Sequence, residues 1–168
     1  MVRNKNQKLA LAGILCAVAV LGSLFSIPVF GSRCAPVQHM VNILCAILLG
    51  PSYGVGVAFS ASLFRNILGL GSIMAFPGSM FGALISALVY KKTGSIPLTL
   101  LGEVFGTGIL GGLCAYPVAV LLMGQAASSI AFYAYIIPFL ISTVGGALLS
   151  AVLITALGKA GVLKTVQN

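Results

Sequence analysis

Acidic residues are almost absent from this sequence. Among its 168 residues the only one is Glu103, charged residues make up 6% of the chain, and His39 is the single histidine. The surface of a soluble domain needs far more charge than this, so a soluble fold is excluded. A metal-dependent hydrolase needs several His, Asp or Glu ligands, and this chain has one His, one Glu and no Asp. We therefore expect no metal and no cofactor.

Motifs for binding ATP or a metal are missing as well. The sequence has no G-x-x-x-x-G-K-[ST] run, so the chain cannot bind ATP through a P-loop. Its four cysteines are widely spaced, which favours small packing residues over a metal site or a disulfide framework. If the chain moves a solute against its gradient, the energy must come from a partner protein or from an ion gradient. Only Glu103 and His39 could carry protons inside a membrane, so an ATP-driven partner is the more economical hypothesis.

Long apolar runs are what the sequence does contain. It is 60% hydrophobic with a mean hydropathy of +1.16, which predicts an all-α integral membrane protein of the cell membrane. Turns rich in Gly, Pro or charge divide the runs into six expected transmembrane helices within a single domain, 1–168. These helices are expected over residues 8–27, 36–49, 52–68, 74–90, 97–123 and 130–157.

Basic residues predict how the helices are oriented. Seven of the nine lie in the N-terminal tail, one internal loop and the C-terminal tail: Arg3, Lys5, Lys8, Lys91, Lys92, Lys159 and Lys164. The positive-inside rule places these segments, and with them both termini, on the cytoplasmic side. The net charge of +8 then indicates contact with the inner leaflet of the bilayer. No basic patch alternates with aromatic residues, so we expect no nucleic-acid partner.

A polar stretch over residues 33–42 interrupts the first two apolar runs. The helix that begins at Pro36 must end before Gly50-Pro51, so about fourteen residues span roughly 21 Å. That is shorter than the roughly 30 Å hydrocarbon core, so its polar outer end must be shielded by protein or line a cavity. We expect the loop half, 33–35, to move as a lid and the helical half, 38–42, to contact a ligand.

Hydrogen-bonding and aromatic residues gather in the expected outer half of the bundle. They suit a neutral or weakly charged small molecule held against aromatic and aliphatic walls. The predicted polar contacts are Gln38, His39, Asn42, Arg65, Asn66, Ser79 and Glu103, and the predicted ring or wall contacts are Phe76, Tyr116 and Tyr133. An intramembrane arginine is costly and therefore a functional candidate, although Arg65 could instead extend to the outer headgroups. Glu103 is expected nearer the cytoplasm.

A catalytic Ser/His/acid set would require Glu103 to meet His39. The expected topology places these two residues at different depths. We therefore do not expect an enzyme.

Small residues in the first helix predict close helix packing. Gly13 and Ala17 are four residues apart, with Ala12 and Cys16 beside them. This narrow stripe favours contact with a neighbouring helix of the same chain, or else docking of a separate subunit.

Several motifs together resemble the ThiW family over nearly the whole chain. They are APVQHMVN at 35–42, LGP at 49–51, RN at 65–66, FPGSM at 76–80 and GEVFGTG at 102–108. The resemblance implies an S component of an energy-coupling factor (ECF) transporter, which binds hydroxyethylthiazole, the thiazole precursor of thiamine. It also implies docking, through small residues of the first helix such as Gly13 and Ala17, onto a transmembrane T component that carries two ABC ATPases.

Three alternatives to this hypothesis stay open. The first keeps the class and changes the ligand to hydroxymethylpyrimidine, thiamine or another vitamin. A cationic ligand such as thiamine should favour more than the one carboxylate present. The second is a self-sufficient carrier or channel, and the third is a structural membrane subunit without a ligand.

Overall fold

Helices make up most of the chain in the computed structural model, which describes residues 4–29 and 32–160. The helical segments are α1 (Lys5–Gly22), η1 (Ser23–Phe25), α2 (Pro36–Leu48), α3 (Pro51–Ile67), α4 (Ala75–Thr93), α5 (Ile96–Glu103), η2 (Val104–Gly111), α6 (Gly112–Leu122), η3 (Ala127–Ser129) and α7 (Ile136–Lys159). Arg3 and Lys164, on which the expected topology also rests, lie outside the described residues.

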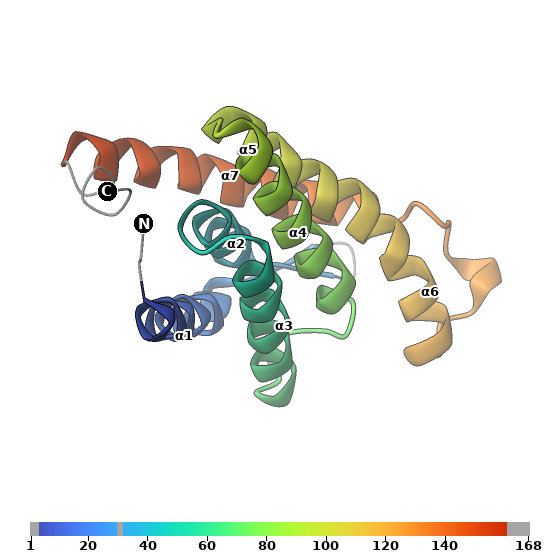
Figure 1. Cartoon of the computed structure of the whole chain (residues 1–168). Helices are drawn as coiled ribbons and strands as arrows, with labels where there is room; N and C mark the ends of the chain where they lie inside the picture. Colours follow the sequence, from blue (N-terminus) through green and yellow to red (C-terminus); the bar gives the residue numbers. More distant parts are fainter. Residues whose placement is uncertain (1–3, 30–31, 161–168) are drawn as a thin grey trace.

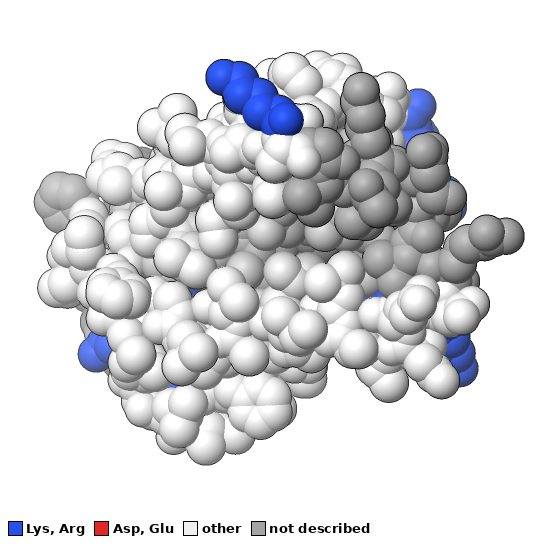
Figure 2. Space-filling view, turned by 90° about the vertical axis from the view of Figure 1, so that its left-hand side faces the viewer, with Lys and Arg blue, Asp and Glu red and all other residues white. Residues whose placement is uncertain are grey.

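The surface of the bundle is apolar, as a protein surrounded by lipid requires. Large hydrophobic side chains are exposed along several helices, including Leu148 and Val152 on α7, and the face in Figure 2 carries few charges. Three segments are long and apolar enough to cross a membrane: Lys5–Phe25, Ile96–Leu122 and Ile136–Lys159. These features confirm the expected all-α membrane protein.

The short helix α2 lies at the centre of the bundle. It packs against α1, α3, α4 and α7, which surround it in Figure 1. At thirteen residues it is about 20 Å long, and most of its side chains are buried, including those of Gln38, His39 and Asn42. Neighbouring helices therefore shield its polar turn from lipid, as its shortness predicts.

A π-helical segment, η2, joins α5 to α6 in one continuous helix directly after Glu103. Glycines bring this segment against α4: a Cβ on Gly106 would meet the backbone of Phe81 and Gly82, and a Cβ on Gly111 would meet Gly78. π-helical turns often occur at functional sites because they change the direction in which side chains project. Here η2 presents Thr107 to α4 beside Glu103.

Two local expectations are wrong. The segment between α1 and α2 is an antiparallel hairpin of β1 (Ile27–Val29) and β2 (Ser32–Cys34), with Pro28 opposite Arg33. The last long helix begins at Ile136, because residues 130–135 form turns rather than helix. Both segments are apolar enough to resemble the end of a helix, and hydropathy alone does not distinguish a helix from a hairpin or a turn.

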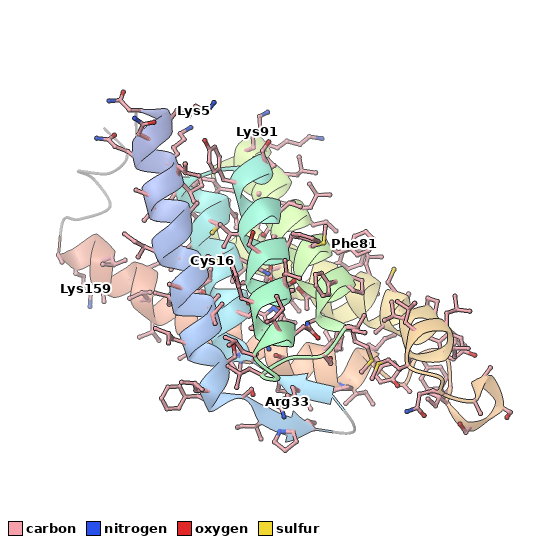
Figure 3. All side chains as sticks on the ribbon, turned by 90° about the horizontal axis from the view of Figure 1, so that it is seen from below. Lys5, Cys16, Arg33, Phe81, Lys91 and Lys159 are labelled. Atoms are coloured by element: carbon pink, nitrogen blue, oxygen red, sulfur yellow. The ribbon has the colours of Figure 1, made fainter. Side chains whose placement is uncertain are left out.

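The helices place basic residues at one end and the hairpin at the other. Figure 3 shows Lys5 and Lys91 at one end of the bundle and Arg33 at the opposite end, while Lys159 ends the inclined helix α7. The sequence predicts Lys5 and Lys91 on the same side of the membrane, and the structure places them at the same end of the bundle. The hairpin end is the one that carries the pocket described below.

We expect Gly82→Ala to destabilise the bundle, because the added Cβ would overlap Thr107 and Glu103. Overpacking of this kind costs about 1–3 kcal/mol. Gly56→Ala is the control, since a Cβ there meets nothing within 4 Å. Unfolding of both variants in detergent should show a loss for Gly82→Ala alone. Equal effects of the two substitutions would contradict this account of the helix contact.

Candidate functional site

A pocket opens at the hairpin end of the bundle, between α2, α3, α4, η2 and α7. Its cavity volume is about 30 Å³, room for about two water molecules, so the walls must move apart to admit a larger ligand. Its walls are formed by Arg33, Ala35, Gln38, His39, Arg65, Ser72, Ala75, Gly78, Ser79, Thr107, Phe139 and Ser142. One aromatic face and several hydroxyl, amide and guanidinium groups therefore face a common space.

Glu103 accepts three hydrogen bonds behind this wall. The ring Nδ1 of His39, the amide Nδ2 of Asn42 and the hydroxyl of Thr107 each lie 3.0 Å from its Oε1 atom. Gly82 leaves the room that this carboxyl group occupies. Glu103 is fully buried, and these contacts join α2, α5 and η2 at one atom.

The other side of the His39 ring extends the network to α7. Its Nε2 lies 3.1 Å from the hydroxyl of Ser142, and the backbone N–H of Ala35 donates to the same hydroxyl at 2.8 Å. With a proton on Nδ1, His39 donates to Glu103 Oε1 and accepts the Ser142 O–H, while Glu103 Oε2 has no hydrogen-bond partner among the described residues. A Cβ on Gly146 would meet His39, so a glycine is needed for α7 to approach this closely.

Arg65 lies at the opposite end of the same network. Asn42 accepts a hydrogen bond from Gln38 at 3.3 Å, and Gln38 accepts from Arg65 Nη1 at 3.5 Å. Asn42 also donates to the backbone carbonyl of Ser79 on α4. Polar side chains of α2 therefore connect α3 and α4 to the buried carboxyl group of Glu103.

The sequence matches the model of one protein family, described as thiamine-precursor transporter protein (ThiW), over residues 9–160. The chain belongs to the ThiW family. No match was found among curated proteins. The matched range contains every residue of the pocket wall and of the network behind it.

Membership of ThiW identifies a transport protein for a thiamine precursor rather than an enzyme. It also accounts for a pocket in a membrane protein. A small-molecule substrate and a lipid bilayer are therefore the partners that family membership supports.

The structure places six of the ten predicted site residues in or directly behind the pocket wall of this ThiW protein. Gln38, His39, Arg65 and Ser79 line the pocket, while Asn42 and Glu103 lie in the network that supports them. Arg65 is only 3% exposed, so it faces the pocket and does not extend to headgroups.

Four predicted residues lie outside the wall. Asn66 donates to the carbonyls of Ser62 and Ser72 and so holds the turn beside the pocket. The remaining three are rings: Phe76 packs on Phe59, Tyr116 donates to a carbonyl at Ala127, and Tyr133 is 55% exposed against Phe132. None of these three rings belongs to the pocket wall.

The expected separation of His39 and Glu103 is wrong. Their side chains meet at 3.0 Å, because α5 crosses α2 at the level of its polar turn. The sequence analysis also missed Ser142, Phe139 and Thr107 as wall residues. Ser142 is one of four serine or threonine residues in the expected span 130–157, so the sequence did not single it out.

Ser142, His39 and Glu103 stand in the order found in nucleophilic hydrolase triads. In this ThiW protein the Ser142 hydroxyl also accepts the Ala35 N–H and is buried, so it ties the start of α2 to α7. We interpret the set as a support for the pocket wall. No group of three or more His, Cys, Asp or Glu that could hold a metal occurs among residues 4–29 and 32–160.

We expect Glu103→Ala to lower the free energy of unfolding by at least about 2 kcal/mol, because three buried donors lose their shared acceptor. Glu103→Gln keeps an acceptor oxygen at this position and should lose less. Denaturant unfolding of both variants in detergent measures the difference. Equal losses would show that the hydrogen bonds do not contribute to stability.

Proposed function

We propose that this ThiW protein is the substrate-binding S component of an ECF-type ABC transporter and binds hydroxyethylthiazole. It is a multi-pass protein of the plasma membrane with both termini in the cytoplasm. The observation that supports this proposal is the pocket at the hairpin end, opposite Lys5 and Lys91. Under the positive-inside rule that end faces outward, where a scavenged precursor arrives.

The pocket wall suits a small heteroaromatic alcohol. Phe139 offers a ring, and Ser79 and Ser142 offer hydroxyl oxygens around it. The network behind His39 fixes its ring on both sides, so the wall is ordered before ligand arrives. Preorganisation of this kind reduces the entropy lost on binding.

The hairpin forms the cap of this site. Cys34 contacts the carbonyl of Pro138 through its thiol at 3.3 Å, and Ala35 donates to Ser142. Both residues are buried, so the segment 33–35 is held on α7. Movement of the cap, which the sequence analysis proposed, requires these two bonds to break.

Energy for uptake would come from a T component and two ABC ATPases, since this chain contains no P-loop. Gly13 and Ala17 are exposed on α1, while Ala12 packs inside the bundle. The small exposed positions allow another helix to approach α1 closely. We propose Gly13 and Ala17 as the docking face for the T component.

A second candidate is a self-sufficient, proton-coupled carrier. It is favoured by one observation: His39 and Glu103 form a buried pair of titratable groups directly behind the pocket wall. Groups of this kind often carry protons in transporters. The two candidates differ in whether this chain accumulates substrate by itself.

In calorimetric titration of the purified chain without ATPases, hydroxyethylthiazole should bind more tightly than hydroxymethylpyrimidine or thiamine. His39→Ala should weaken binding at least about tenfold, because it removes a ring from the pocket wall and the partner that orients Ser142. Tyr133→Ala is the control outside the wall and should leave the affinity unchanged. Tight binding of either other compound, with no binding of the thiazole, would refute the substrate assignment.

Reconstituted vesicles distinguish the S component from the carrier. We expect uptake of labelled hydroxyethylthiazole only when the T component, both ATPases and ATP are present. The control is the same vesicle with an ATPase that cannot hydrolyse ATP. Accumulation by this chain alone, driven by a pH gradient, would favour the carrier.

A further inference from the structure

Two arginines line the pocket, and no acidic side chain faces them. Arg33 on β2 and Arg65 on α3 both belong to the wall. The only acidic residue in the sequence, Glu103, lies behind the wall and is bonded to His39, Asn42 and Thr107. The only ion pair among the described residues is the contact between His39 and Glu103, so the two guanidinium groups have no protein counter-charge there.

Arg65 is the more informative of the two because it is buried. It is 3% exposed, and its Nε has no hydrogen-bond partner in the part of the chain that the structure describes. Its one side-chain hydrogen bond among the described residues, from Nη1 to Gln38 Oε1, is long at 3.5 Å. A guanidinium group has five donors, and a buried charge without a partner is costly. Most of the binding capacity of Arg65 is therefore left for a group inside the pocket.

An anionic oxygen group satisfies this geometry. Carboxylates and phosphates bind two neighbouring N–H groups of arginine side by side, and such charge-assisted bonds are about twice as strong as neutral ones. The hydroxyl group of a neutral alcohol can accept from one N–H group but cannot neutralise the charge. A thiazolium cation would be repelled by both arginines.

We propose that the pocket prefers its thiazole ligand in an anionic form, with a carboxylate or phosphate monoester on the side chain held by Arg65 and Arg33. This inference rests on the proposed function for the thiazole ring, while the anion site itself depends only on the two arginines. The remaining wall, with Phe139 and the hydroxyl groups of Ser79 and Ser142, contacts the ring and its substituents.

Calorimetric titration with three ligands tests the preference. The ligands are hydroxyethylthiazole, its phosphate monoester, and the matching thiazole acetate, in which a carboxylate replaces the alcohol. At least one anion should bind about tenfold or more tightly than the alcohol, because charge-assisted hydrogen bonds exceed neutral ones by this much. The ratio between the two anions identifies which group the site accepts. Equal or tighter binding of the alcohol would overturn the inference and leave the proposed function standing.

Matched variants locate the effect. Arg65→Gln should remove the preference for the anion, and Arg33→Gln should reduce it. Lys91→Gln, which removes one positive charge at the opposite end of the bundle, should leave the preference intact. If Arg65→Gln does not fold, Arg33→Gln decides, since Arg33 is exposed on the hairpin. A preference that survives both arginine substitutions, or that is lost equally in Lys91→Gln, would overturn the inference.

Thermal unfolding with inorganic phosphate or acetate separates the two claims. Stabilisation of the unaltered chain that is absent from Arg65→Gln or Arg33→Gln, without binding of any thiazole, would support the anion site and refute the thiazole function. No effect of simple anions together with no preference among the thiazoles would refute the anion site.

Discussion

The carboxyl group of Glu103 is the point on which the interior of this protein depends. Its Oε1 atom receives hydrogen bonds from α2 and η2, and through His39 it is connected to Ser142 on α7. Inside a membrane no water competes for these groups, so an unpaired donor is costly. Packing that brings these donors to Glu103 is therefore favoured, and it forms the pocket wall.

Glycine makes this convergence possible. Gly82 leaves room for the carboxyl group of Glu103, and Gly146 allows α7 to approach His39. The π-helical segment then turns Thr107 toward the same place. Without a hydrophobic driving force between helices in lipid, close packing and interhelical hydrogen bonds hold the bundle together. The small residues let the helices approach closely, and the polar network forms hydrogen bonds across the close contacts.

The pocket has two chemically different sides. On one side His39 and Ser142 are supported by a carboxyl group, and on the other Arg65 and Arg33 have no acidic partner. A transport site must release its ligand, so it benefits from a few directional contacts rather than complete enclosure. A hairpin held on α7 by Cys34 and Ala35 closes the site with bonds that are few enough to break.

Composition and charge by themselves determined the class of this protein. One acidic residue and long apolar runs require a membrane environment, Pro36 and Gly50-Pro51 fix a central helix too short to span, and this shortness requires its polar turn to be shielded. Motifs in the chain were sufficient to identify the ThiW family. These properties depend on residue type and on the lengths of segments, and both can be read directly from the sequence.

Only the tertiary structure decided which polar residues meet. Hydropathy places a residue along a helix but does not give the rotation, tilt or crossing point of that helix, so His39 and Glu103 were expected apart and are bonded. For the same reason Ser142 and Phe139 were missed, while Tyr116 and Tyr133 were included although neither forms part of the pocket wall. The site is set by how glycine-lined helices cross, and that crossing depends on contacts between residues distant in the sequence.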